Sequence, residues 1–281
     1  MTVIKTKEWL YKIMELSKKS SGRSLDDVHC EIICDPLMFH FEDVPKEALH
    51  YELLRNGLFT PDECMGLEKV VKEMERQNVW RIVSEEYKIL RELWEGPEVN
   101  IYIFPISKNI EMNSEEPVPN KNGIAFKNAV FLFVSTELPP EEIKAMLAHE
   151  YNHVCRLGYL QLPPTQISLQ DSLIVEGLGE YAVKELYGEK WLAPWVNMYT
   201  LEEMLVIWKQ YFMPSLKIKG VIHHHPFMYG EINGTLPKWI GYAIGYYIVD
   251  TFRKHHASCD FKELCLKYAY EIIKESYFKM F

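Results

Sequence analysis

One segment, residues 138–160, constrains the fold of this 281-residue chain more than any other. It reads LPPEEIKAMLAHEYNHVCRLGYL, with two prolines and two glutamates at its start, as at a helix N-terminus. Apolar residues then recur at helical spacing, and Gly158 can close the helix in the left-handed conformation. Such a helix places His149 and His153 on one face, one turn apart. The chain must therefore fold so that this face meets a partner suited to two imidazoles.

Two imidazoles at this spacing can reach one Zn²⁺, since each Zn–N bond is about 2.0–2.1 Å long. Glu150 follows His149 directly, so it lies near that ion but one step round the helix. A carboxylate there can take a proton from a water on the metal, which is the general-base role in HExxH helices. Cys155 turns away from the histidine face and is not counted as a ligand. The pattern predicts a catalytic zinc helix with His149 and His153 as ligands.

A catalytic zinc site needs a third protein ligand, and the next segment supplies a candidate. Ser168 and Asp171 resemble a capping box, which predicts a helix from about residue 169 to 186. Glu176 lies in this helix, after a loop long enough for the second helix to return beside the first. We therefore expect a site of two histidines and Glu176, with an open fourth position.

Neighbours of Glu176 support this expectation. Gly177 and Gly179 each cost about 1 kcal/mol relative to alanine in a helix interior, and close approach of the zinc helix can offset that. Glu180 stands one turn further, where it can accept the second N–H of a ligand histidine. Two alternatives stay open: Glu180 can form an ordinary surface pair with Lys184, and Glu176 can be a plain surface acid.

Hydrolysis at zinc also requires a donor for the oxygen that gains negative charge. The segment PKWIGYAIGYYIVD offers Tyr242 and Tyr246, one turn apart if helical, and Tyr242 is our first choice. The segment VIHHHPFMYG offers His223 and the two histidines after it, in a predicted loop. The alternatives are core aromatic residues for the tyrosines and a solvated loop for the histidines.

The two parts of the chain differ in local pattern. Residues 1–95 show helical periodicity, including one helix expected from Thr60 to about Gly96, whereas residues 30–44 read as a strand or an extended connection. Residues 98–106 and 123–135 are rich in β-branched and aromatic residues and are predicted strands.

A polar loop is expected at residues 107–122, and helices resume from residue 139. We therefore predict an α+β, mostly helical fold, with a helical N-terminal part at 1–95 and a catalytic domain at 96–281.

Composition narrows the function classes. The formal net charge of −9 disfavours a nucleic-acid partner, because phosphate binding needs a basic surface. The apolar runs are too short to span a bilayer, and the charged N-terminal segment is not a secretory signal. We expect a cytoplasmic protein whose partner is a peptide or protein substrate.

The chain resembles zincin metallopeptidases that use a glutamate as third ligand, and more closely the DUF2268 family of predicted Zn-dependent proteases. The segments that carry the likeness are HEYNHVCRLG, LIVEGLGEYAV and LPKWIGYAIGYYIVDTF, and it covers roughly residues 95–255. The resemblance implies a zincin-like fold with a small β-sheet over the motif helix. It also implies that His149, His153 and Glu176 bind one Zn²⁺ per chain and that Glu150 is the catalytic base.

Zincins also place an edge strand above the zinc helix, where an extended substrate pairs. The candidate is FKNAVFLFVS, whose NAVF is similar to a thermolysin-type edge strand, so the resemblance implies substrate binding at Asn128 and Ala129. The chain departs from thermolysin at Val175, where thermolysin has an asparagine before its third ligand.

The sequence thus predicts a zinc-dependent metallopeptidase in which Glu150 activates a water on the zinc. One alternative is a zinc hydrolase of a non-peptide substrate, because the site chemistry does not fix the acyl group. The other is a non-catalytic binding or regulatory protein with a zincin fold. The presence of Glu150 disfavours the second alternative, since such a protein does not need the base.

Overall fold

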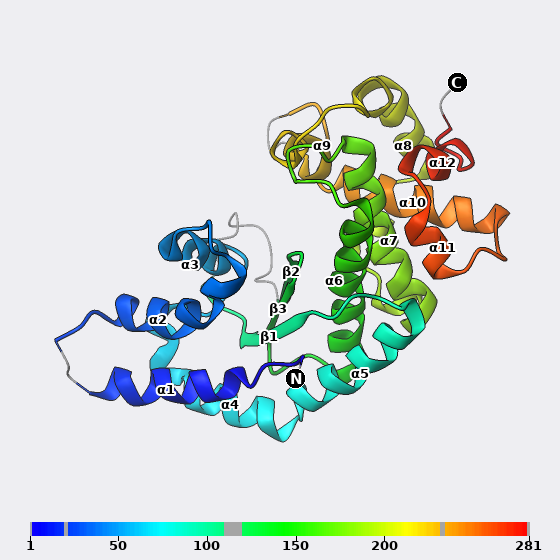
Figure 1. Ribbon diagram of the computed structural model, residues 1–281. Helices are drawn as coiled ribbons and strands as arrows, with labels where there is room; N and C mark the ends of the chain where they lie inside the picture. The colour runs from blue at the N-terminus through cyan, green and yellow to red at the C-terminus, as the bar shows by residue number, and fades with distance from the viewer. Residues whose placement is uncertain (1, 20–21, 110–119, 231–233, 280–281) are drawn as a thin grey trace. The chain divides into compact units, whose positions relative to one another are not determined.

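The computed structural model describes residues 2–19, 22–109, 120–230 and 234–279, and Figure 1 shows its helices and strands. The chain divides into two compact units. Unit 1 comprises Met1–Arg91 and Glu98–Leu147, and unit 2 comprises Glu92–Pro97 and Ala148–Phe281. The predicted boundary at residues 95/96 does not coincide with this division, because the small sheet groups with the N-terminal helices.

Unit 1 begins with five helices. They are α1 (Thr6–Lys18), α2 (Leu25–Cys34), α3 (Lys46–Arg55), α4 (Leu67–Arg76) and α5 (Val79–Trp94), with 3-10 helices at Asp35–His40 and Pro61–Gly66. The prediction of one helix from residue 60 to 96 is wrong, because Asn78 adopts a left-handed φ of 57° and separates α4 from α5. The ambiguous segment 30–44 belongs mainly to the end of α2 and the 3-10 helix after it.

Three strands form the sheet of unit 1 in the order β1-β3-β2. They are β1 (Asn100–Pro105), β2 (Lys121–Ala125) and β3 (Ala129–Val134), and β3 pairs parallel with β1 and antiparallel with β2. The predicted strand at 123–135 is therefore two strands joined by a turn. Of the predicted loop at 107–122, residues 110–119 lie outside the described residues, and β2 begins within its last part.

The prediction of an edge strand at Asn128 and Ala129 is wrong. β3 lies at the centre of the sheet, with both of its edges occupied by neighbours, so it cannot pair with an extended substrate. Every residue of β3 is buried, as a continuous apolar run such as AVFLFV requires when both faces are covered. The α+β, mostly helical fold class is confirmed, whereas the position of the sheet over the motif helix stays a prediction.

The regular secondary structure of unit 2 is helical in the residues that the structure describes. Its helices are the second half of α6 (Pro140–Leu160), α7 (Leu169–Tyr187), α8 (Leu201–Ile207), α9 (His225–Tyr229), α10 (Ile240–His255), α11 (Phe261–Leu266) and α12 (Ala269–Lys274). Shorter 3-10 or π turns lie at Glu189–Trp191, Pro194–Asn197, Trp208–Phe212, Met213–Ser215 and Val221–His223. Among the described residues, no helix combines the length and apolarity needed to cross a membrane.

The ends of the two central helices follow local sequence. α7 begins with the predicted capping box of Ser168 and Asp171 and ends at Gly188. α6 runs through Gly158, and Gln161, with φ of 48°, takes the left-handed conformation that we expected of the glycine.

α10 packs along α7, and small residues set the distance between them (Figure 1). A Cβ on Gly177 would lie 2.1 Å from the carbonyl oxygen of Gly245, so the two backbones are in contact there. Gly177 therefore serves the packing of α7 on α10 and not, as we expected, the approach of the motif helix.

The motif half of α6 is anchored within unit 2 by a fully buried arginine. The guanidinium of Arg156 donates Nη1–H bonds to the carbonyl oxygens of Cys265 at 2.5 Å and Lys267 at 2.7 Å. These carbonyls end α11, so Arg156 satisfies groups that a helix C-terminus leaves unpaired. Nearer the start of the same half of α6, the ring of Tyr151 stacks on the ring of Trp94, with centroids 5.8 Å apart.

Candidate metal centre

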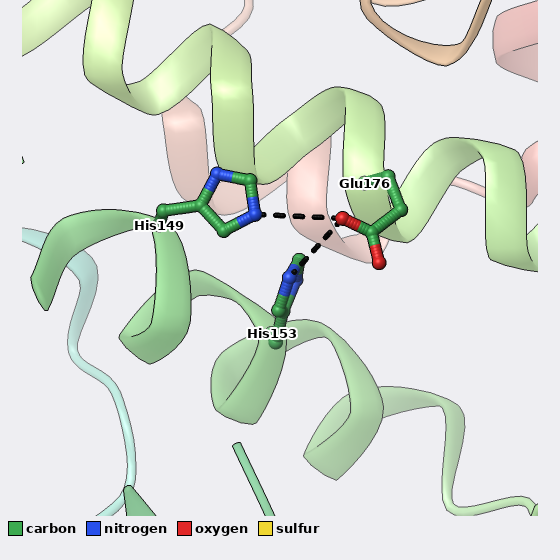
Figure 2. Close-up of side chains that lie close together, drawn as sticks. All are labelled: His149, His153 and Glu176. Atoms are coloured by element: carbon green, nitrogen blue, oxygen red, sulfur yellow. Dashed lines mark ion pairs between the residues drawn. The ribbon is translucent and has the colours of Figure 1, made fainter. Parts of the chain in front are cut away.

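Three side chains from α6 and α7 converge in unit 2. The Nε2 atoms of His149 and His153 lie 3.4 and 3.5 Å from the same oxygen, Oε2 of Glu176. Figure 2 shows both rings directed from α6 at the Glu176 carboxylate on α7. One ligand atom from each residue lies within 4.8 Å of the other two. The structure thus brings these residues together as their helical spacing predicts.

The distances between these atoms fit a tetrahedral zinc ion. Atoms bound to one tetrahedral Zn²⁺ at about 2.0–2.2 Å stand about 3.3–3.5 Å apart. The separations of Glu176 from His149 and His153 match that tetrahedral edge. Two imidazoles and one carboxylate are also a donor set of catalytic zinc sites, which keep the fourth position open.

The charges of the site favour a cation. Glu150 and Glu180 are buried beside Glu176, and no described lysine or arginine pairs with any of the three. Burial raises the pKa of Glu150, although His153 and His149 oppose this rise. Burial alone would lower the pKa of His149, but hydrogen bonds with Glu176 and Glu180 outweigh it and raise that pKa to about 10. Buried carboxylates need compensating charge, which a divalent ion supplies.

Glu180 lies behind the first histidine. Its Oε2 is 3.2 Å from Nδ1 of His149, and its Oε1 accepts a hydrogen bond from the backbone N–H of Ala193 at 2.5 Å. A carboxylate in this position fixes the tautomer of the imidazole and directs Nε2 towards Glu176. The alternative surface pair with Lys184 is wrong, because that ammonium bonds Asp250 at 2.7 Å.

Gly179 provides the close approach of the two helices. A Cβ at this position would lie 3.0 Å from Cε1 of His153 and 3.1 Å from Nδ1 of His149. Of the two glycines that we associated with the motif helix, Gly179 alone contacts the histidines. A larger side chain here would press on both imidazole rings.

Tyr242 lies within electrostatic reach of the centre. Burial and then the carboxylate of Glu176 raise its pKa well above the usual value, with a smaller contribution from Glu150. Its hydroxyl donates a hydrogen bond to the hydroxyl of Tyr229 on α9 at 2.9 Å.

Tyr246, our second candidate, belongs to a different cluster. It is buried, and Nζ of Lys184 lies 5.9 Å from its ring centroid. Asp250 raises the pKa of Tyr246 after burial, whereas none of the three site glutamates contributes to it. Tyr246 is thus coupled to Lys184 and Asp250, whereas Tyr242 is coupled to Tyr229 and Glu176.

The histidine run has a structural member between two exposed ones. His224 is buried, donates Nε2–H to the carbonyl of Ile218 at 3.0 Å and accepts at Nδ1 from Ser172 of α7 at 2.7 Å. Burial lowers the pKa of His224, which keeps the ring neutral. His223, our candidate, is exposed and ends the 3-10 turn Val221–His223, against Gly220. Its exposure agrees with the solvated alternative, although the segment forms a 3-10 turn and then α9 instead of the predicted loop.

Sequence reasoning missed three aromatic residues around Tyr242. Trp195, Tyr229 and Trp239 have ring centroids 5.2–5.3 Å from that of Tyr242. Tyr229 and Trp239 lie in the two segments searched for an oxyanion donor, so a wider search for aromatic residues there could have found them.

Comparison with known proteins gives one family and two relatives. Residues 79–274 match the family model described as "Predicted Zn-dependent protease (DUF2268)". The uncharacterized protein YjaZ of Bacillus subtilis (strain 168) is 33% identical over 254 residues, which cover 90% of this chain and 91% of YjaZ. The uncharacterized protein YjfC of the same organism is 30% identical over 126 residues, 41% of this chain and 40% of YjfC. No solved structure matches the chain significantly. The chain therefore belongs to the DUF2268 family of predicted Zn-dependent proteases.

Proposed function

We propose that this chain is a zinc-dependent metallopeptidase in which His149, His153 and Glu176 bind the metal and Glu150 is the general base. The observation that carries the proposal is the convergence of two imidazole Nε2 atoms on one carboxylate oxygen, at the spacing of a tetrahedral zinc edge. The excess of buried carboxylates over cations supports a divalent ion at this place. The description of the family supports both zinc and proteolysis.

His149, His153 and Glu176 would hold the Zn²⁺, which would supply Lewis acidity to the substrate carbonyl and to a nearby water. The carboxylate of Glu150 would take the proton of the attacking water and pass it to the leaving amine as the peptide bond breaks. Burial raises the pKa of Glu150, so this group is a stronger base than a solvated carboxylate and can hold the proton between the two steps.

Two other side chains assist. The phenol of Tyr242 keeps its proton, because burial and the nearby carboxylates raise its pKa. It can exchange its hydrogen bond with Tyr229 for one to the peptide carbonyl oxygen as that oxygen gains negative charge. Glu180 holds the ring of His149 through Nδ1–H, so the lone pair of Nε2 is available to bind the metal.

Hydrolysis of casein and of a peptide library by zinc-loaded protein tests the proposal. We expect cleavage by the wild type and a fall in kcat of about 10²–10⁴-fold in Glu150→Gln, with zinc content unchanged. Glu141→Gln is the matched control, because Glu141 is exposed on the same helix and should leave kcat unchanged.

Equal rates for Glu150→Gln and the wild type would contradict the assignment of the base. A zinc-containing wild type that hydrolyses small esters or amides but no peptide would instead indicate the non-peptide hydrolase. Bound zinc without any hydrolysis would indicate the binding protein.

A further inference from the structure

We propose that Trp195, Tyr229, Trp239 and Tyr242 form an aromatic subsite that binds an uncharged aromatic side chain of a peptide beside the metal centre. The inference rests on the proposed function, because the metal centre is taken to act on the peptide held there. It adds a substrate class to that function.

The four rings form one connected cluster within unit 2. They come from the 3-10 turn Pro194–Asn197, from α9 and from the start of α10. The ring of Tyr242 contacts the other three, with centroid distances of 5.2 Å to Trp195, 5.2 Å to Trp239 and 5.3 Å to Tyr229. Trp239 also stacks on Trp195 at 5.3 Å and meets Tyr229 edge to face at 5.1 Å. These distances lie in the favourable range for aromatic pairs.

This cluster lies outside the core. Tyr242 packs against the main hydrophobic core of unit 2, whereas Trp195, Tyr229 and Trp239 are not among the residues of that core. Tyr229 is 38% exposed, and the two tryptophans are half-buried. Aromatic surface thus continues outward from Tyr242 and remains open to contact. Apolar surface next to a few placed polar groups is typical of ligand-binding sites.

An unpaired donor in the cluster indicates a ligand. Nε1 of Trp195 is buried and has no hydrogen-bond partner among the residues that the structure describes. Buried polar groups in proteins are almost always paired, so this N–H calls for an acceptor. A peptide carbonyl next to the bound side chain supplies one.

The backbone conformation of Trp239 is a second indication of a ligand-binding site. This residue has φ of 58° and ψ of 15°, a left-handed conformation that bulky residues rarely adopt. Its N–H donates to the carbonyl of Tyr229 at 2.9 Å, which holds the two rings side by side. Backbone outliers of this kind gather at ligand-binding sites.

Two features select the chemistry of the ligand. Tyr242 lies one turn before Gly245 on α10, and the backbone of Gly245 meets Gly177, the residue after Glu176, so a peptide held at the metal centre brings an adjacent side chain to the rings. Nζ of Lys238 lies 5.8 Å from the ring centroid of Trp239, so a cation of the chain itself already takes the place over that ring that an arginine or lysine of the ligand would need. An uncharged aromatic side chain suits both features.

Binding measured without turnover tests the inference. Zinc-loaded Glu150→Gln protein is titrated with acetyl-Ala-Phe-Ala-amide, acetyl-Ala-Ala-Ala-amide and acetyl-Ala-Arg-Ala-amide, and binding is followed by tryptophan fluorescence and saturation-transfer NMR. The titration is repeated after removal of the metal by a chelator. We expect the Phe peptide to bind about tenfold more tightly than the other two, from ring contact and apolar burial.

Variants of the cluster locate the effect. Trp195→Ala and Tyr229→Ala should abolish the preference for Phe, and Trp195→Phe, which keeps a ring, should retain part of it. Trp191→Ala is the matched control, since Trp191 is also half-buried but lies under Lys190, with Nζ 4.6 Å from its ring centroid. Tyr229→Ala gives the answer if Trp195→Ala fails to fold, because Tyr229 is the most exposed of the four rings.

The outcomes separate this inference from the proposed function. Equal binding of the Phe and Ala peptides would overturn the aromatic subsite. A loss of the preference for Phe in Trp191→Ala as large as in Trp195→Ala would also overturn it. Cleavage of a peptide library without aromatic preference would also overturn it while supporting the peptidase. Selective binding of the Phe peptide by a protein that cleaves nothing would support the subsite and overturn the peptidase.

Discussion

Each unit of the chain holds a pair of histidines in close contact, and the two pairs differ in their surroundings. In unit 1, Nδ1 of His29 lies 2.8 Å from Nε2 of His50, and the ring of Phe59 meets His29 edge to face at 4.7 Å. In unit 2, the rings of His149 and His153 are 4.6 Å apart at their centroids and share their site with three glutamates.

The surroundings set opposite charge preferences. Burial, followed by the neighbouring imidazole, lowers the pKa of His29 to about 3, so the first pair stays neutral. At His149 the bonded carboxylates outweigh burial and raise the pKa to about 10. Two adjacent imidazoles therefore do not make a metal site by themselves; anionic neighbours do.

Zinc retention gives the largest expected contrast between the pairs. His149→Ala and Glu176→Ala each remove a proposed ligand and should reduce bound zinc to background, whereas the wild type should retain about one ion per chain. His29→Ala should retain as much as the wild type, because among the described residues no carboxylate forms an ion pair with either histidine of its pair. Elemental analysis after dialysis measures all four, and depletion in His29→Ala would break the comparison.

The second contrast concerns Glu180. Glu180→Gln keeps the shape of the side chain but removes the charge that faces Nδ1 of His149, so zinc affinity should fall about 10–100-fold. Competition with a chelating dye measures the affinity. Glu185→Gln is the control on the same helix, since Glu185 bonds Arg253 instead. Equal affinities in both variants would show that Glu180 has no part in orienting the histidine.

Substitution of the two glycines of α7 distinguishes an effect on the metal site from an effect on helix packing. Gly179→Ala presses on both ligand rings and should weaken zinc binding, by less than Glu180→Gln, because the rings can give by a few tenths of an ångström. Gly177→Ala meets the backbone of α10 and should destabilise the fold by about 1–3 kcal/mol through overpacking. Urea unfolding and zinc titration of both variants should show opposite patterns, and the same pattern in both would contradict this division.

The last contrast is the pH dependence of stability that the His29–His50 pair contributes. Burial lowers both pKa values, so below about pH 6.5 the unfolded chain binds protons that the folded chain does not. Stability should therefore fall as pH decreases from 6.5 towards 4, by up to about 1.4 kcal/mol per pH unit for each histidine. Urea midpoints at several pH values measure it, and a His29→Leu/His50→Leu variant should show a shallower slope. An unchanged slope would show that the pair does not titrate with unfolding.

The helices of the site can be predicted from the sequence, because residues close together in the chain determine where they begin and which side chains share a face. The four-residue spacing of His149 and His153 puts them on one face, and the capping box at Ser168 fixes where α7 begins, hence the turn that carries Glu176 and Glu180.

Features that depend on contacts between distant parts of the chain could not be predicted from the sequence. The central place of β3 depends on which strands pair, so Asn128 and Ala129 were assigned to an edge that the sheet does not have. Gly177 and Gly179 look alike in sequence, and only the neighbours of α7 show that they face different helices. The left-handed turn at Trp239 follows from tertiary packing, because bulky residues ordinarily avoid that conformation, whereas Asn78 belongs to a residue type that adopts it readily.

The central claim is a metal bound by two imidazoles and one carboxylate, without sulfur. X-ray absorption at the zinc edge of the zinc-loaded protein tests it most directly. Burial raises the pKa of Cys155, the cysteine nearest the motif in sequence, to about 12 and keeps its thiol protonated. We predict nitrogen and oxygen neighbours at about 2.0–2.2 Å, with the outer scattering of two imidazole rings. A sulfur neighbour at about 2.3 Å, or a single imidazole, would contradict the account.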